Sequence, residues 1–598
     1  MRILRPLHPS QVAELLAISR CAVVVLMSLF LPISHAFGQN PPTFSQVIVF
    51  GDSYSDDGNV RRRTETASGG QVSYPSGVYN FADGRFTNSA NTTPGSAMYA
   101  GLWHEQLAQS FLGLPAATFS LGGGTDFAFG AATTQNGTSE RTVIPSPGGD
   151  LTITIDNMGK QVDDYLASHA VNGNALYLVW GGINDLLNDE SPASVSATAN
   201  RVGSLISRLA LAGANHILVP NVPPLGMFPN YAGDEARITS LNEAAGAYRF
   251  QLDAALDSTV NTLAAQGVHP TIYRLDIWSR FVRIAAQPSD YGFTDIGHVA
   301  QGDSSANPDQ FLFWDVLHPT TAGHFQIAKE ANRALSGSAG ASARALNLSS
   351  RVTVGTGENV SIAGFIITGS IAKRVLLRGI GPSLTGSGVP DVLANPTLEL
   401  FDSANSSLAT NDNWRTTQES EIAATGLAPT NDLESAIIRT LAPGSYTAVL
   451  AGQNGGNGNG LVEVYDLDTA PGATLANIST RGFVGVGNNV LIGGLIIGSG
   501  QGPIVAMRAI GPSLLNAGIT HPLLDPTIEL HNGNGDEIEF NDDWKDTQTA
   551  AIRAIGLTPA DDREATIVAS LEPGNYTVIV RGRNNTTGVA LVEAYRIP

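Results

Sequence analysis

Three residues whose types suit nucleophilic catalysis lie far apart in this chain of 598 residues. Ser53 directly follows Gly51-Asp52 near the start, whereas Asp315 and His318 stand much later with two residues between them. A serine hydroxyl is a weak nucleophile until a base removes its proton, and a histidine oriented by a carboxylate can serve as that base. These are the residue types that acyl transfer requires. By itself, Gly51-Asp52-Ser53 also fits a strand-to-loop turn with a capping serine.

The elements around these residues predict a three-layer α/β/α domain over residues 40–335. Apolar runs typical of strands occur at residues 47–50, 176–180, 217–219 and 271–273. Between them, apolar residues recur at helical spacing, as in residues 202–209 and 241–256. Strands that alternate with helices favour a parallel sheet covered on both faces. Ser53 follows the first strand, and ligands bind beyond the carboxyl ends of such strands.

Four segments resemble, in the same order, the blocks of the GDSL (SGNH) family of serine esterases and lipases. They are Phe50-Gly51-Asp52-Ser53 with Asp56 and Gly58-Asn59, then residues 124–131, residues 182–185 and residues 313–320. The resemblance implies that Ser53 is the nucleophile. It implies that His318 is the base toward Ser53 and the acid toward the leaving group, and that Asp315 orients the imidazole. The alternative for Asp315 and His318 is a surface turn before a helix at residues 321–335.

The same resemblance implies an oxyanion hole with three donors. These are the main-chain N–H of Ser53, the main-chain N–H of Gly130 and the side-chain amide of Asn184. An asparagine amide donates at any pH, and a glycine lets the backbone approach a substrate closely. The second block, residues 124–131, departs from the family pattern at two positions. Asp126 stands where asparagine is common, and Ala131 stands where a second glycine is common.

A further segment, Asp83-Gly84-Arg85-Phe86-Thr87-Asn88, resembles a loop of some branches of the family. An insertion at residues 89–101 follows it, and we expect this insertion to reshape the mouth of the pocket. Four other histidines have no carboxylate at matching spacing and are expected to be structural or exposed: His104, His216, His298 and His324.

Composition and motifs exclude several other functions. The net charge of −20 and the pI near 4.9 argue against nucleic acid and anionic membrane surfaces as partners. The chain has no Gly-x-Ser-x-Gly motif, and it has neither cysteine pairs nor a His-Glu-x-x-His motif for zinc. We therefore predict no cofactor and no metal in the catalytic site.

Residues 1–36 are typical of a secretory signal peptide. Arg2, Arg5 and Arg20 precede an apolar run at residues 21–31, and Ser34-His35-Ala36 supplies small residues for cleavage. The run is shorter than the roughly 20 residues that cross a bilayer, and a buried helix is the alternative. Cleavage would remove the only cysteine, Cys21. We predict a secreted or cell-surface protein whose mature chain has no transmembrane segment.

An internal repeat fills the rest of the chain after a small-residue linker at residues 336–346. Residues 347–468 recur as residues 477–598, and Arg378-Gly379-Ile380-Gly381-Pro382-Ser383-Leu384, for example, returns as residues 508–514. Strand formers entered through Pro-Gly turns predict two all-β modules, as sandwiches in tandem. The paired turns at residues 411–413 and 541–543 fit either calcium ligands or ordinary polar turns.

The favoured function is a secreted serine hydrolase that cleaves carboxylic esters through an acyl-enzyme on Ser53, with the β-modules serving attachment or substrate targeting. The expected partner is an ester substrate, namely a lipid, a short-chain ester or an acetylated glycan. Cell-surface or polysaccharide contact through the repeats is also expected. The alternative is an extracellular adhesin or glycan-binding protein whose hydrolase domain is degenerate.

Overall fold

The computed structural model describes residues 43–89, 100–143, 151–337, 343–468 and 472–597. The chain divides into two compact units between Ala339 and Gly340, and each is described separately below. The predicted signal peptide at residues 1–36 and much of the predicted linker lie outside the described residues. Within them, no helix combines the length and apolar character needed to cross a membrane.

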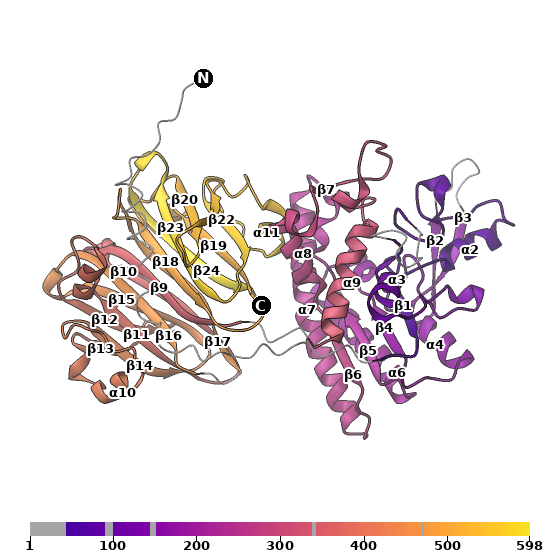
Figure 1. Ribbon diagram of the computed structural model, residues 1–598, viewed down its shortest axis with the longest axis horizontal. Coiled ribbons are helices and arrows are strands. Elements are labelled where there is room, and N and C mark those ends of the chain that lie inside the picture. Colours follow the sequence, from indigo (N-terminus) through magenta and orange to yellow (C-terminus); the bar gives the residue numbers. More distant parts are fainter. Residues whose placement is uncertain (1–42, 90–99, 144–150, 338–342, 469–471, 598) are drawn as a thin grey trace. The chain divides into compact units, whose positions relative to one another are not determined.

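The N-terminal unit is built on a parallel sheet of four strands in the order β1-β4-β5-β6 (Figure 1). Its strands are β1 (Val47–Gly51), β4 (Leu176–Trp180), β5 (His216–Pro220) and β6 (Thr271–Leu275). Two small pairs accompany it: β2 (Thr138–Val143) with β3 (Leu151–Asp156), and β7 (Asp295–Val299) with β8 (Phe311–Phe313). The fully buried side chains of β1 and β4 explain why both strands consist of continuous apolar runs.

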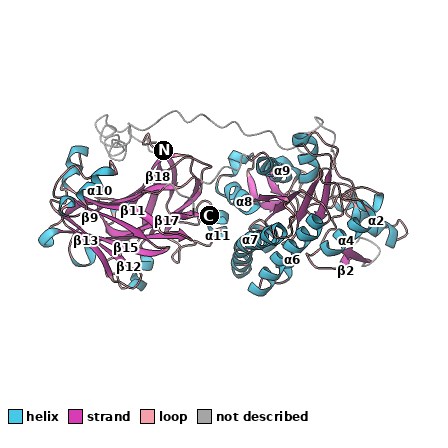
Figure 2. Ribbon diagram, turned by 90° about the horizontal axis from the view of Figure 1, so that it is seen from below, coloured by secondary structure: helices cyan, strands magenta, loops and turns pink. Residues whose placement is uncertain are grey.

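Helices cover both faces of this sheet (Figure 2). Helices α4, α6 and α7 pack on one another along one face, and α8 packs with α9 along the other. The helices are α2 (Asn59–Ala67), α3 (Trp103–Gln106), α4 (Met158–Ser168), α5 (Ile183–Asn188), α6 (Pro192–Leu211), α7 (Glu235–Ala264), α8 (Ile277–Ala286) and α9 (Thr321–Leu335). The predicted three-layer α/β/α fold is confirmed.

The chain changes direction across the sheet at β1. On the side away from β4, the backbone at Thr125 and Phe127 hydrogen-bonds to Val49 at 3.0 and 2.8 Å. The chain then crosses to the other side of β1 to form β4. Such a switch point leaves a crevice at the carboxyl ends of the strands, where ligands bind in open α/β sheets. Ser53 follows β1 at this point.

The C-terminal unit is all-β, as predicted. The first copy holds β9 (Ala345–Val354), β10 (Ser361–Gly369), β11 (Lys373–Ile380), β12 (Pro396–Asp402), β13 (Ser407–Asn411), β14 (Ser435–Leu441), β15 (Gly444–Gly452) and β16 (Gly458–Asp466), with the short helix α10 (Glu419–Ala424). The second holds β17 (Ala473–Val484), β18 (Leu491–Ile497), β19 (Ile504–Ile510), β20 (Pro526–His531), β21 (Glu537–Asn541), β22 (Ala565–Ser570), β23 (Gly574–Gly582) and β24 (Gly588–Ile597), with α11 (Thr549–Ala554).

The two copies exchange strands, which the sequence did not predict. Strand β17 of the second copy pairs with β10 of the first, and β9 of the first pairs with β18 of the second. Among the described residues, the 16 strands therefore form two antiparallel runs, which a single pairing of Phe483 in β17 with Thr353 in β9 joins into one sheet. The runs are β13-β12-β15-β10-β17-β24-β19-β22 and β14-β11-β16-β9-β18-β23-β20-β21. Each copy completes both runs, so the copies are not separate sandwiches.

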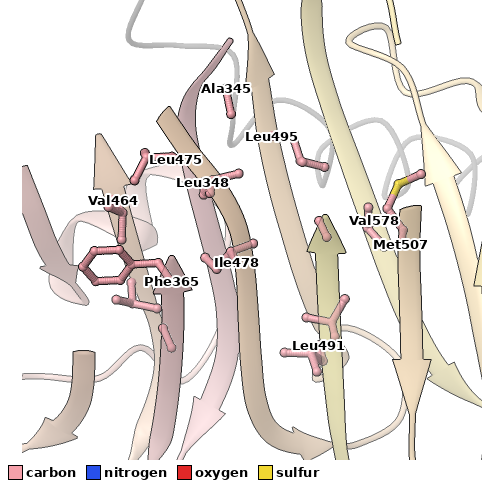
Figure 3. Packing of buried hydrophobic residues seen from close by; sticks show 14 of the residues in the cluster. Ala345, Leu348, Phe365, Val464, Leu475, Ile478, Leu491, Leu495, Met507 and Val578 are labelled. Atoms are coloured by element: carbon pink, nitrogen blue, oxygen red, sulfur yellow. The ribbon is translucent and has the colours of Figure 1, made fainter. Parts of the chain in front are cut away.

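One hydrophobic core spans both copies. Phe365 and Val464 of the first copy lie in the same buried cluster as Ile478 and Leu495 of the second (Figure 3). The cluster buries the inner face of each exchanged strand against both copies. Burial of apolar area stabilises a fold by roughly 25 cal/mol per Å², so each copy depends on the other for part of its stability.

The copies differ where their exchanged strands meet most closely. Gly482 in β17 corresponds to Val352 in β9 at the repeat offset of 130. A Cβ at Gly482 would lie 2.2 Å from the Val352 side chain, far inside van der Waals contact. Two valines do not fit there, so the sequence keeps glycine in one copy.

Candidate active site

The turn after β1 holds Ser53 in a fixed position. The side chain of Gln161 both accepts from the N–H of Gly51 at 3.0 Å and donates to its carbonyl at 2.9 Å. Asp56 accepts hydrogen bonds from the N–H groups of Gly58, Asn59 and Val60 at the start of α2. Asp56 thus caps the start of α2, and this helix begins directly behind the serine.

The turn after β8 presents Asp315 to His318. The N–H of Trp314 donates to the carbonyl of His318 at 2.8 Å and closes a tight turn. Asp315 Oδ1 accepts the N–H groups of Leu317 and His318 at 2.8 and 2.6 Å, which orients the carboxylate. His318 Nδ1 then lies 2.8 Å from Asp315 Oδ2. Burial by itself would raise the pKa of Asp315, but His318 and the two N–H donors bring it below its ordinary value.

The two turns meet at the edge of the sheet. His318 Nε2 lies 2.8 Å from Ser53 Oγ, although the residues are 265 positions apart in the chain. The side chains of His318 and Asp315 are each 12% exposed, and Ser53 is 9% exposed, so the group is largely shielded from solvent. Hydrogen bonding to the carboxylate assigns the imidazole proton to Nδ1, which leaves Nε2 free to accept the serine proton. The structure thus brings together all three residues predicted for proton transfer.

Asn184 lies on the neighbouring strand end. It is in the first turn of α5, directly after β4, which pairs with β1. Its side-chain amide donates to the carbonyl of Ala132 at 3.0 Å, and this bond leaves one amide hydrogen for another acceptor. Asp185 accepts from the N–H and hydroxyl of Thr134 at 2.9 and 2.8 Å, so the start of α5 is tied to the 130–134 segment.

The prediction for Gly130 needs a correction. The N–H of Gly130 donates to Asp56 Oδ2 at 2.8 Å, so it is not available to an oxyanion. The next N–H, that of Ala131, has no hydrogen-bond partner among the described residues, and neither has that of Ser53. Ala131 has a φ of 67°, a conformation that glycine adopts most easily. This explains why glycine is common there in the family, and it makes Ala131 the better candidate donor.

Asp126, which stands where asparagine is common in the family, holds the nucleophile turn. It is fully buried, and its carboxyl oxygens accept the N–H groups of Asp57 and Ala128 at 3.0 and 2.9 Å. Burial, together with the neighbouring Asp57 carboxylate, raises the pKa of Asp126 well above its ordinary value.

Sequence reasoning missed one contact between the two turns. The hydroxyl of Tyr54, next to the nucleophile, donates to the carbonyl of Leu317, next to His318, at 2.8 Å. The Tyr54 ring also lies 5.9 Å from the His318 ring. Only the fold brings these residues together, so no spacing in the sequence signals the contact.

The other histidines do not join the site. His104 and His324 are fully buried behind it, and desolvation lowers the pKa of both. The His298 side chain is 85% exposed and lies 2.9 Å from Asp295. These buried and exposed placements agree with the roles expected for the three histidines. The expectation about spacing was wrong for His298, because Asp295 stands three positions before it, as Asp315 does before His318.

In the repeats, carboxylate oxygens of Asp525, Asp542 and Asp543 lie within 4.8 Å of one another. Arg583 pairs with Asp542 at 2.8 Å, and Asn541 binds the turn internally through Asp543 and Thr566. These contacts favour a polar turn, and calcium binding at the site stays a prediction.

Comparison with known proteins gives the family. Residues 47–331 match the model of the GDSL-like lipase/acylhydrolase family. A phosphatidylcholine-sterol acyltransferase of Aeromonas hydrophila is 25% identical over 345 residues, which cover 48% of this chain and 90% of that protein. GDSL esterase/lipase 6 of Arabidopsis thaliana is 24% identical over 338 residues, covering 50% of this chain and 90% of the other.

A third relative has a higher sequence identity but is matched over a smaller share of its own length. An uncharacterized protein of the trpE-trpG intergenic region of Pseudomonas putida is 29% identical over 345 residues. The alignment covers 52% of this chain and 52% of that protein. In all three cases about half of this chain is matched. The segment from residue 47 to residue 331 belongs to the GDSL family of lipases and acylhydrolases, and the N-terminal unit is an ester-hydrolase domain of that family.

Proposed function

We propose that the protein is a secreted serine hydrolase that cleaves carboxylic esters through an acyl-enzyme on Ser53. The observation that carries the proposal is the continuous hydrogen-bonded chain from Ser53 Oγ through His318 to Asp315, with both links at 2.8 Å. A chain of serine, histidine and carboxylate at these distances has the geometry required of an activated nucleophile.

The reaction follows from this geometry. Ser53 Oγ attacks the ester carbonyl as His318 Nε2 accepts the hydroxyl proton, and Asp315 stabilises the resulting imidazolium. The imidazolium then returns the proton to the departing alcohol, and the acyl group stays on Ser53. Water, activated by the same imidazole, hydrolyses the acyl-enzyme, so that a carboxylic acid leaves and the free serine is restored.

Charge on the carbonyl oxygen requires donors in both steps. We assign this role to the N–H groups of Ser53 and Ala131 and to the free amide hydrogen of Asn184. Donors held in place before the reaction stabilise a developing oxyanion at little reorganisation cost. The bonds of Gly130 to Asp56 and of Asn184 to Ala132 hold this segment, so the donors are fixed without substrate.

The test is the Ser53→Ala variant with two assays: hydrolysis of p-nitrophenyl acetate and covalent labelling by a fluorophosphonate probe. We expect both to disappear. The control is Ser55→Ala, because Ser55 lies in the same turn but accepts a hydrogen bond from Trp103 Nε1, and no hydrogen bond joins its side chain to His318 among the described residues. Hydrolysis by Ser53→Ala at the wild-type rate would show that another residue is the nucleophile.

The substrate class and the role of the repeats extend the proposal. Lipids, short-chain esters and acetylated glycans all offer the required carbonyl, and the name of the Aeromonas relative favours an acyl lipid. We propose that the C-terminal unit attaches the enzyme to a cell surface or polysaccharide. A screen over acyl-chain length ranks the substrates. A pull-down of the 345–598 fragment on insoluble polysaccharides tests the repeats, and absence of labelling in the wild type would favour the adhesin alternative.

A further inference from the structure

The segment from Asp83 to Asn88 lies directly against the catalytic histidine. The ring of Phe86 stacks on the imidazole of His318, with 5.0 Å between ring centroids and 26° between the planes. Phe86 is 6% exposed, so its ring is held in a packed environment. One face of the imidazole is therefore covered by an aromatic ring from a part of the chain that the mechanism does not use.

The two residues after Phe86 hold the backbone that follows His318. The hydroxyl of Thr87 donates to the carbonyl of Pro319 at 3.0 Å. The side-chain oxygen of Asn88 accepts the N–H of Thr321 at 2.7 Å. Thr87 is fully buried, so its bond does not compete with water. These three consecutive residues thus contact the imidazole and the backbone that directly follows it.

The segment is itself fixed to the nucleophile side of the site. Arg85 forms two hydrogen bonds to the carboxylate of Glu105, at 2.8 and 2.6 Å, and lies 3.9 Å from Asp57. Gly84 has a φ of 81°, and a Cβ there would lie 2.6 Å from the carbonyl oxygen of Asp57. A side chain at Gly84 would push the segment away from the turn that carries Ser53. The segment therefore spans the two turns whose distance sets the Ser53–His318 hydrogen bond.

We propose that Phe86, Thr87 and Asn88 are positioning residues for His318, an inference that rests on the proposed function. The imidazole must keep Nε2 within reach of Ser53 Oγ and then present the same proton to the leaving group. Phe86 blocks rotation of the ring to one side, and Thr87 and Asn88 fix the backbone from which the ring extends. An aromatic face also attracts a cation, so Phe86 stabilises the imidazolium that forms during the attack. The segment from Asp83 to Asn88, which resembles a loop of some branches of the family, thereby has a specific role in positioning His318.

The test compares Phe86→Leu with Phe81→Leu. Phe81 lies 5.7 Å from Phe86 in the same aromatic cluster, and in the described part of the chain its ring makes no ring contact with His318, so it is a control for lost packing. We expect kcat for p-nitrophenyl acetate and the labelling rate with fluorophosphonate to fall by about 10- to 100-fold in Phe86→Leu, because small misplacement of a catalytic group has effects of this size. KM should stay within about threefold, and Phe81→Leu should keep the wild-type kcat.

A second pair of variants separates position from folding. Thr87→Val removes the hydroxyl that binds Pro319 and should lower kcat, whereas Thr87→Ser keeps the hydroxyl and should restore it. All rates are expressed per labelled site, which removes the unfolded fraction. The inference is overturned if Phe86→Leu retains the wild-type kcat, or if Phe81→Leu loses as much as Phe86→Leu. Neither result touches the proposed function, which fails only if Ser53→Ala remains active and labelled.

Discussion

The two units of this chain bury charged residues in different ways. In the repeats, several buried ionic clusters recur in both copies, although the buried Lys373–Asp466 pair does not, since Pro503 and Arg596 stand at the matching positions. Arg378 pairs with Glu463, which also accepts from the hydroxyl of Tyr465. The same triad returns 130 positions later as Arg508, Glu593 and Tyr595. A cluster kept in both copies, whatever surrounds each copy, serves the fold they share.

In the hydrolase unit, four buried acids that occur once gather beside the nucleophile, whereas others, such as Glu330, are buried elsewhere and paired with arginine. Asp52, Asp56 and Asp57 lie in the nucleophile turn, and Asp126 lies in the neighbouring segment. Burial raises the pKa of Asp52 to about 7 and that of Asp56 to about 6. Perturbed groups that cluster in one place are typical of a functional site. Comparison of the two copies thus distinguishes buried polar clusters that recur and serve the fold from a buried cluster that occurs once and is a candidate for catalysis.

The strongest way to break this comparison is His318→Ala. If the catalytic site of the hydrolase unit carries the chemistry, kcat should fall by a factor on the order of 10⁶, as for removal of a catalytic base in serine hydrolases. The unfolding transition of the repeats should not change, since His318 lies in the other unit. The measurement is turnover of p-nitrophenyl acetate together with urea unfolding. Substantial residual turnover would place the base elsewhere.

A substitution made separately in each copy of the repeat tests whether the recurring buried clusters stabilise the fold. The carboxylate of Glu434 is fully buried and accepts the N–H groups of Gly381 and Ser383 at 3.0 and 2.9 Å. Glu434→Ala leaves these donors unpaired and should lower the free energy of unfolding by about 3–5 kcal/mol. Esterase turnover should stay at the wild-type level. Urea unfolding followed by tryptophan fluorescence measures the loss.

The second copy supplies the control for this substitution. Glu564 makes the same bonds to Gly511 and Ser513, at 3.1 and 2.9 Å. Glu564→Ala should therefore be about as destabilising as Glu434→Ala. A large effect in one copy and none in the other would mean that recurrence does not identify structural clusters.

The sequence predicted those parts of the molecule that depend on local pattern. Continuous apolar runs predicted β4 with its bounds at Leu176–Trp180, and the helix expected after the Asp315–His318 turn is α9 at Thr321–Leu335. Ser53, Asp315 and His318 were found through motifs that each lie within a few residues. Their convergence required the fold, because 265 positions separate His318 from Ser53.

What the sequence did not predict depends on long-range partners. The Gly130 N–H is bound to Asp56, 74 positions away, so the motif indicated the correct segment but the wrong N–H. The repeat indicated two copies, but nothing local records that β17 pairs with β10 of the first copy and β9 with β18 of the second. Gly482 opposite Val352 is a trace of that exchange, and it can be interpreted only once the strands are placed.

A smaller effect on activity is expected for Asn184→Ala. Loss of one oxyanion donor costs about 10²–10³ in kcat. KM should change little, since the donor acts mainly on the charge of the transition state. Asn188→Ala is the matched control, because Asn188 is an exposed asparagine at the end of the same helix. Equal turnover of the two variants would remove Asn184 from the oxyanion hole.

The smallest effect concerns pH and Asp52. Its carboxyl is 1% exposed, and burial raises its pKa from 3.8 to about 7. The folded state then holds a proton that the unfolded state has already released, so stability from this group falls as pH rises from about 4 to about 7. Asp52→Asn cannot ionise, and it should lose a few degrees less of Tm between pH 5 and pH 8 than the wild type. The exposed Asp83→Asn serves as the control in scanning fluorimetry. If Asp52→Asn and the wild type lose the same Tm, Asp52 is already ionised in the folded protein at pH 5, and the pKa of this group does not set the hydrolase unit apart from the repeats.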